Sequence, residues 1–244
     1  MQVERLGSGP RVVLVHGSVV GAETWSRQRP LAERWALELV TRPGFLPLEP
    51  VERVDFEADA PLVAAQLGDG AHLVGHSYGG VISLLAAAQR PEAVRSLTVI
   101  EPPALGVARG DAAADAMIAR VEELWAEGAP TPEPRAFLDV FLRTVGSSIP
   151  PVDELPPALR RGAELLLVER PPSEARIPFA VLREAGFPVL VASGAHSPAF
   201  DAVCDVLERE LAAERLVLPG SGHAVQRVPG FNDALERFLV RASP

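Results

Sequence analysis

The chain has 244 residues, of which 48% are hydrophobic, and its formal net charge is −9. This length suits one large domain, or a core with a small insertion, and gives ample sequence for a buried interior. All 23 basic residues are arginines and are outnumbered by 32 acidic ones, which argues against a surface for nucleic acid or for an anionic membrane.

The first residues of the chain and its apolar runs indicate where the protein is located. Residues 1–5 lack the basic start and apolar core of a signal peptide, and no apolar run approaches membrane-spanning length. We therefore expect a cytoplasmic protein.

The single cysteine, Cys204, cannot form an internal disulfide. It falls on the apolar stripe of a predicted helix, so we expect it to pack in the core.

Apolar segments alternate with helical ones along most of the chain, which is typical of a mostly parallel sheet covered by helices on both faces. The first predicted strand is a continuous branched run at residues 11–15, as expected of a buried central strand. Further strands are predicted at residues 36–40, 71–74, 94–100, 188–192 and 215–218. Helices are predicted at residues 25–35 and 59–67, after Ser77, and after each of the last two strands.

The strand pattern disappears over residues 104–186. Helical patterns around residues 112–127 and 135–145 are broken by proline pairs at 150–151, 156–157 and 171–172. We interpret this stretch as a helical insertion over the carboxyl ends of the strands, where open α/β sheets bind ligands. Three aromatic residues are candidates to line a substrate cavity, although such spacing is more often internal packing: Trp125, Phe137 and Phe141.

Residues 75–79 read Gly-His-Ser-Tyr-Gly and lie between an apolar strand pattern and a helix of small residues. The motif G-x-S-x-G recurs by chance, but strand, sharp turn and helix together are the setting that exposes a nucleophilic serine. Glycines two positions before and after Ser77 remove the Cβ atoms that such a turn would crowd. We therefore predict that Ser77 is a nucleophile rather than a capping residue.

A serine nucleophile needs a base, and histidine suits this role. His223 stands in a glycine-rich loop directly after the last predicted strand, so it can reach the same edge of the sheet as Ser77. His16 ends a strand and is expected to shape a turn, His72 lies inside a strand, and His76 is the variable residue of the motif. No histidines are paired with a supporting ligand at helical spacing, so we expect no metal.

An oxyanion formed at Ser77 needs backbone donors. The N–H of Tyr78, the residue after the nucleophile, is one candidate, and a second is expected from the loop after the first predicted strand. Ser18 is the best candidate there. A plain turn role for Ser18 is the alternative, and its side chain need not take part.

Three motifs occur in order on this scaffold: residues 16–18 (His-Gly-Ser), 75–79 and 222–223 (Gly-His). Together they resemble the α/β-hydrolase superfamily over nearly the whole chain. The resemblance implies a core of residues 1–103 and 187–244 under a helical cap of residues 104–186. It also implies an eight-stranded sheet, here without its first two strands, a triad of serine, acid and histidine, and an acyl-enzyme. A serine at the turn implies esters, thioesters, amides or activated C–C bonds.

The acid departs from the family pattern. Members of the superfamily usually carry an aspartate just after the strand at residues 188–192, but residues 193–198 here contain no carboxylate. Asp201 is explained by the first turn of a helix, where a negative charge is favourable. Glu101 ends the strand at residues 94–100 and resembles the acid of those superfamily members that take it from the strand after the nucleophile helix. We favour Glu101, with Asp201 or a Ser–His dyad as alternatives.

We therefore expect a cofactor-independent serine hydrolase of a small carboxylic ester or related acyl substrate. Ser77 attacks, His223 moves the proton, Glu101 orients His223, and the N–H groups of Ser18 and Tyr78 hold the oxyanion. The expected partner is a small-molecule acyl substrate, with neither nucleic acid nor membrane, and no oligomeric state follows from the sequence. The alternatives are a C–C bond hydrolase or lyase on the same fold, and a non-catalytic small-molecule-binding member.

Overall fold

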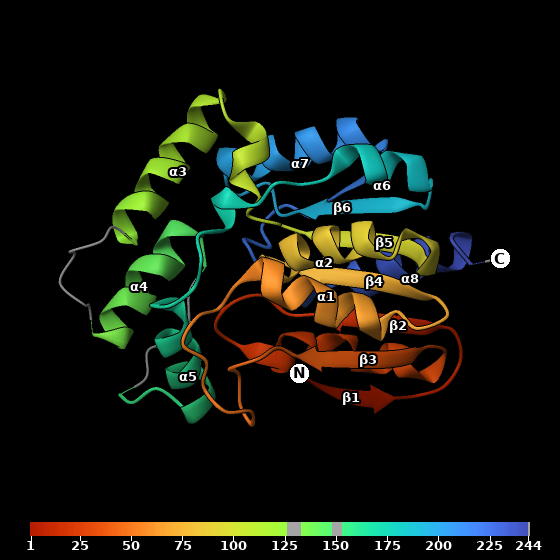
Figure 1. Cartoon of the computed structure of the whole chain (residues 1–244), viewed down its shortest axis with the longest axis horizontal. Coiled ribbons are helices and arrows are strands. Elements are labelled where there is room, and N and C mark those ends of the chain that lie inside the picture. Colours follow the sequence, from red (N-terminus) through yellow and green to blue (C-terminus); the bar gives the residue numbers. More distant parts are fainter. Residues whose placement is uncertain (126–132, 148–152, 244) are drawn as a thin grey trace.

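A twisted sheet runs through the middle of the molecule (Figure 1). The computed structural model describes residues 1–125, 133–147 and 153–243, and within them seven strands pair in the order β1-β3-β2-β4-β5-β6-β7. They are β1 (Gln2–Leu6), β2 (Arg11–Val15), β3 (Ala36–Thr41), β4 (Ala71–His76), β5 (Val94–Ile100), β6 (Val189–Ser193) and β7 (Glu214–Val217). β1 is antiparallel to β3, and the other pairs are parallel. β4 therefore lies at the centre.

All six predicted strands are present, which confirms the predicted α/β fold class. The sheet has one strand that the sequence analysis missed, the edge strand β1. Its five residues are all exposed or half-buried, so it lacks the continuous apolar run that marks the central strands. The predicted helix at residues 25–35 is wrong in type: Gly21–Glu33 forms 3-10 turns with Pro30 inside them, because proline removes a donor that an α-helix needs.

Successive residues of β2 point to opposite faces of the sheet and enter two separate hydrophobic cores. Val13 and Val15 belong to the core under α1 (Phe56–Gln66), α2 (Tyr78–Gln89) and α7 (Pro198–Leu211). Val12 and Leu14 belong to the core under the 3-10 segment and α8 (Phe231–Arg241). Cys204 lies in the first core and is fully buried, so burial raises the pKa of its thiol. This environment agrees with a packing role.

Among the described residues, the predicted insertion forms four α-helices: α3 (Ala112–Leu124), α4 (Pro134–Thr144), α5 (Pro157–Leu166) and α6 (Phe179–Ala185). α3, α4 and α5 stand together at one end of the sheet, whereas α6 lies beside α7 in the layer that covers the sheet (Figure 1). α4 and α5 share a small core of their own. Residues 126–127 of the helical pattern and the proline pair at 150–151 lie outside the described residues. The division into core and cap stays a prediction.

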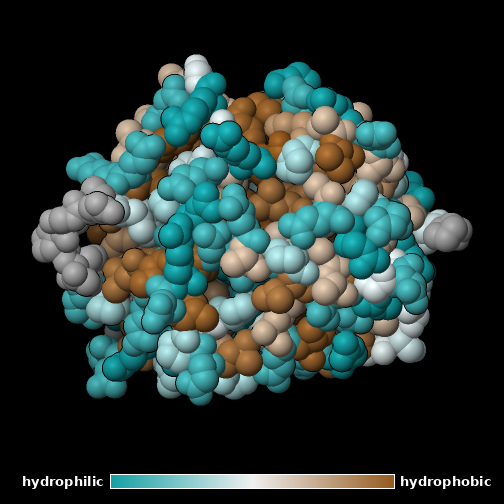
Figure 2. All heavy atoms as spheres, viewed as in Figure 1, coloured by the Kyte–Doolittle hydropathy of each residue, from teal (hydrophilic) through white to brown (hydrophobic). Residues whose placement is uncertain are grey.

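Hydrophilic residues are spread over most of the face shown in Figure 2, with apolar residues between them. None of the helices in the described part of the chain is both long enough and apolar enough to cross a bilayer.

The helix α5 passes close to the loop after β2. A Cβ atom at Gly162 would collide with the backbone of Val19, including its carbonyl oxygen. Val19 itself has a φ of +77°, which is strained for a β-branched residue. The glycine in α5 therefore lets this helix approach the loop closely.

We predict that Gly162→Ala lowers the free energy of unfolding by about 1–3 kcal/mol, as overpacking does. At an open helical position the same change would raise it by about 0.5–1 kcal/mol, because alanine is the better helix former. Thermal or urea unfolding measures the sign. An increase in stability would contradict the close approach of α5 to Val19.

Candidate active site

Ser77 occupies a sharp turn between the central strand β4 and α2. Its backbone has φ 53° and ψ −126°, a strained conformation for a residue with a side chain. Alanine at Gly75 would collide with the Gly79 carbonyl and the Ser83 hydroxyl. Alanine at Gly79 would collide with carbonyl oxygens of the strand β2 and its loop. The predicted strand, turn and helix are all present, and they hold Ser77 at the carboxyl edge of the sheet.

His223 lies beside Ser77, as the sequence predicts. Its Nε2 is 2.9 Å from Ser77 Oγ, a distance at which the hydroxyl donates a hydrogen bond to a neutral ring nitrogen. His223 comes from the loop between β7 and α8, and its side chain is 7% exposed. The sheet thus joins two residues that are 146 positions apart in the chain.

Glu101 lies behind His223 at the end of β5. Its Oε2 is 3.5 Å from His223 Nδ1, and its side chain is fully buried. Its Oε1 accepts a hydrogen bond of 2.6 Å from the N–H of Gly194. The backbone of Glu101 has a φ of +49°, an uncommon value for a non-glycine residue. Serine, imidazole and carboxyl group therefore stand in a row.

The charge of Glu101 follows from its surroundings. Burial alone would raise the pKa of this carboxyl group, but the imidazoles of His196 and His223 and the Gly194 N–H lower it to about 2. Glu101 is therefore ionised at neutral pH. A carboxylate on this side of His223 favours the tautomer with a proton on Nδ1, which leaves Nε2 free to accept the serine proton.

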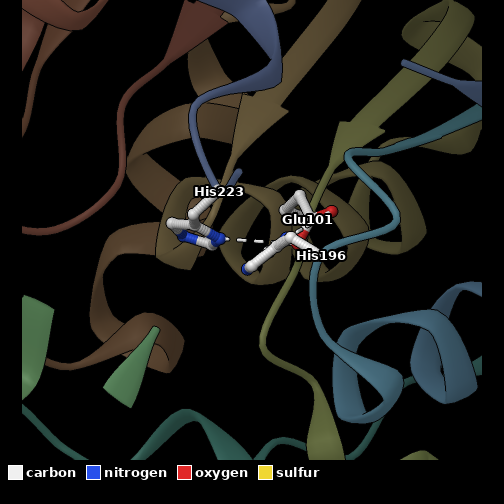
Figure 3. Close-up of side chains that lie close together, drawn as sticks. All are labelled: Glu101, His196 and His223. Atoms are coloured by element: carbon white, nitrogen blue, oxygen red, sulfur yellow. Dashed lines mark ion pairs between the residues drawn. The ribbon is translucent and has the colours of Figure 1, made fainter. Parts of the chain in front are cut away.

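A second imidazole, His196, was not singled out in the sequence analysis. Its Nδ1 is 3.6 Å from Glu101 Oε1, and its Nε2 is 3.0 Å from the carbonyl oxygen of Val145, next to α4. Figure 3 shows Glu101 with His223 and His196 close to it. The ion pair with Glu101 raises the pKa of His196 against the opposing effect of burial. The only sequence signal was a histidine in the loop that usually carries the acid.

The same three side chains could offer one ligand atom each to a metal ion, since these atoms lie within 4.8 Å of one another. A metal held there would occupy His223 Nδ1 and remove it from Glu101. Asp201, the other candidate acid, points elsewhere: its carboxylate is 3.4 Å from the guanidinium of Arg215 on β7.

Ser18 lies on the loop after β2, next to Ser77. A Cβ at Gly17 would stand 2.8 Å from that of Ser77, so the loop passes directly over the turn. Among the described residues, neither the N–H of Ser18 nor that of Tyr78 has a hydrogen-bond partner. Two free donors beside a serine hydroxyl suit an oxyanion. The Ser18 hydroxyl donates to the carboxyl group of Glu169, and Ser18 Oγ lies 2.7 Å and 2.8 Å from the two carboxyl oxygens.

The other histidines near the site support its loops. His16 Nε2 accepts from the N–H of Arg42 at 3.1 Å, and its Nδ1 is 2.7 Å from the carbonyl of Gly17. His76 Nε2 is 2.9 Å from the backbone carbonyl of His223. Burial lowers the pKa of each of these two rings to about 3. Both are therefore neutral hydrogen-bonding groups, and His16 shapes its turn as expected.

Two chambers meet at Ser77. One encloses about 580 Å³ of space between protein atoms, part of it open to solvent, and has a polar part formed by Thr24, His76, Ser147, His223, Gln226 and Arg227. The other encloses about 420 Å³ of space between protein atoms, part of it open to solvent, and is lined mainly by apolar side chains, including Leu105, Met117, Val121, Trp125, Phe141 and Phe200. Trp125 and Phe141 thus line a cavity, whereas Phe137 packs in the small core of α4 and α5.

We predict that Glu101→Gln lowers the pKa of His196, because it removes the ion pair that raises this pKa and leaves the burial that lowers it. NMR titration of the imidazole signals, assigned with His196→Asn, measures the shift. An unchanged His196 pKa would contradict the pairing with Glu101. In the wild type this pair stabilises the fold below the ordinary histidine pKa of about 6.5 and ceases to do so as pH rises through the raised value.

A family model described as the alpha/beta hydrolase family matches residues 12–235. The chain is 38% identical over 99 residues to a pimeloyl-[acyl-carrier protein] methyl ester esterase of Chromobacterium violaceum, across 40% of this chain and 39% of that protein. An esterase of the same name from Aeromonas hydrophila is 34% identical over 114 residues, across 46% and 45%. The matched region therefore spans less than half the length of these curated relatives.

The arrangement in space extends over the whole chain. An alpha/beta hydrolase from Sphaerobacter thermophilus superimposes with a TM-score of 0.69 and 26% identity, over 99% of this chain and 95% of that one. The likeness in fold thus includes the insertion as well as the sheet.

Proposed function

Because the chain belongs to the alpha/beta hydrolase family, we propose that it is a serine hydrolase that cleaves a small carboxylic ester or a related acyl compound. The observation that carries the proposal is the 2.9 Å contact between Ser77 Oγ and His223 Nε2 on the strained turn. The relatives named methyl ester esterases support ester cleavage. An assembled nucleophile and base favours catalysis over a role in binding alone.

The first half of the reaction forms an acyl-enzyme. Ser77 Oγ attacks the substrate carbonyl carbon while its proton passes to His223 Nε2. The tetrahedral intermediate then collapses, and His223 returns the proton to the leaving alcohol. In the second half a water molecule attacks the acyl carbon while His223 accepts its proton. The bond between the acyl carbon and Ser77 Oγ then breaks, His223 returns the proton to Oγ, and the carboxylic acid departs.

Negative charge on the carbonyl oxygen is stabilised by the N–H groups of Ser18 and Tyr78. Both are unpaired among the described residues and fixed before substrate arrives, so no reorganisation is needed as charge develops. Tyr78 is also the first residue of α2, where the helix dipole favours an anion.

Glu101 is the third member of the triad in this proposal. As a buried carboxylate 3.5 Å from Nδ1, it orients His223 and stabilises the imidazolium that forms when Ser77 is deprotonated. Asp201 is engaged with Arg215 instead. The helices α3, α4 and α5 form the cap, and the apolar chamber beneath them receives the acyl group.

We predict that Ser77→Ala abolishes hydrolysis of p-nitrophenyl butyrate while the protein remains folded. His223→Ala should lose activity by a comparable factor, because members of a triad act as a unit and their effects do not add. Initial rates with circular dichroism as a folding control measure both. Full esterase activity in Ser77→Ala would overturn the assignment of the nucleophile.

We predict that Glu101→Gln lowers kcat by about 10²–10⁴ with little change in KM, because the defect lies in the tautomer and charge of His223. Asp201→Asn is the matched control and should behave as a surface change. Near-normal kcat in Glu101→Gln with a large loss in Asp201→Asn would move the acid to Asp201. Near-normal kcat in both variants would leave a Ser–His dyad.

A further inference from the structure

Glu169 is a buried carboxyl group that the mechanism does not use. It follows α5, forms an isolated bridge with Val54, and is 4% exposed. It lines the apolar chamber together with Ser77 and Ser18. In the described part of the chain, the hydrogen bonds to its carboxyl group come from a single side chain, the hydroxyl of Ser18.

None of the arginines in the described ranges forms an ion pair with Glu169. The nearby guanidinium of Arg42 pairs with Asp59 at 2.8 Å, and the Tyr78 hydroxyl donates to a backbone carbonyl at 3.2 Å. Burial raises the pKa of Glu169 to about 7, against the lowering effect of Arg42 and Ser18.

A buried carboxyl group with a raised pKa can be neutral, and it then acts as both a hydrogen-bond donor and an acceptor. The neutral form has one O–H to donate and a second oxygen that accepts. Burying such a group in an apolar wall is unfavourable unless it is hydrogen-bonded. One hydroxyl leaves part of its hydrogen-bonding capacity unused. The unused capacity lies beside Ser18, whose N–H is one of the two proposed oxyanion donors.

The rest of the chamber is suited to hydrocarbon. Apart from Ser77, Ser18, Glu169 and the engaged Tyr78, its lining consists of Pro103, Leu105, Met117, Val121, Trp125, Phe141, Val145, Pro172 and Phe200. An acyl chain bound in this chamber would contact one polar pair, Ser18 and Glu169. This contact would lie close to the reacting carbonyl group.

We propose that Ser18 and Glu169 form a recognition site for a hydroxyl group on the acyl chain, near the reacting carbonyl, so that the enzyme prefers hydroxyacyl esters to alkanoyl esters. This inference rests on the proposed esterase function. The substrate hydroxyl donates to one carboxyl oxygen of Glu169 or accepts from its O–H. An alkanoyl chain leaves this polar pair facing hydrocarbon, and sites built to bind a hydroxyl discriminate against analogues that lack it.

The test compares p-nitrophenyl esters of butyrate, 2-hydroxybutyrate and 3-hydroxybutyrate. In the wild type, kcat/KM for at least one hydroxyacyl ester should exceed that for butyrate by about tenfold, which corresponds to one net hydrogen bond. Glu169→Leu should abolish this preference. The matched variant Glu169→Gln should keep most of it, because an amide still donates and accepts. The ratio is the readout, so a general loss of activity common to all the esters does not affect it.

A second measurement uses the wild-type protein alone, in case Glu169→Leu does not fold. Free 2- or 3-hydroxybutyrate should inhibit at a lower concentration than butyrate, by a similar factor. A wild type that hydrolyses all three esters alike through Ser77, or a preference that survives in Glu169→Leu, would overturn the recognition site and leave the esterase intact. A wild type that hydrolyses none of the three would instead contradict the proposed function.

Discussion

The site depends on the conformation that the chain is forced to adopt at Ser77, between the central strand and the helix after it. At φ 53° the turn is strained, and the packing around it must supply the compensating free energy. That packing is possible only because Gly17, Gly75 and Gly79 allow backbone to approach within contact distance. The loop after β2, which carries Ser18, is thereby held against Ser77.

The position of Glu101 is a second consequence of the sheet order. β5 lies next to β4 and β6 follows it, so a residue at the end of β5 and one in the loop after β6 both reach the ring of His223. Here Glu101 ends β5, turns with a φ of +49° and binds the Gly194 N–H of the neighbouring loop. His196 stands on that loop, and its Nδ1 lies 3.6 Å from Oε1 of the same carboxyl group. The carboxylate thus lies between two imidazole rings.

The sequence was sufficient where the signal is local. Strands with continuous apolar runs, the glycine-framed turn at Ser77 and the glycine-rich loop carrying His223 are each contained in a few residues. The edge strand β1 was not predicted because its residues are half-buried at most and form no continuous apolar run. Glu169 was not predicted for a different reason: it follows an apolar run at residues 165–168, but its contact with Ser18 joins residues 151 positions apart. Contacts of this kind depend on tertiary packing, which local patterns do not encode.

The central claim is that Ser77 is a nucleophile activated by His223. A fluorophosphonate reacts with activated serines, and peptide mass spectrometry locates the adduct. The wild type should carry one phosphonyl group on the peptide that contains Ser77, and His223→Ala should react far more slowly because the hydroxyl has lost its base. An adduct on a different serine, or equally fast labelling of Ser77 in His223→Ala, would contradict the account.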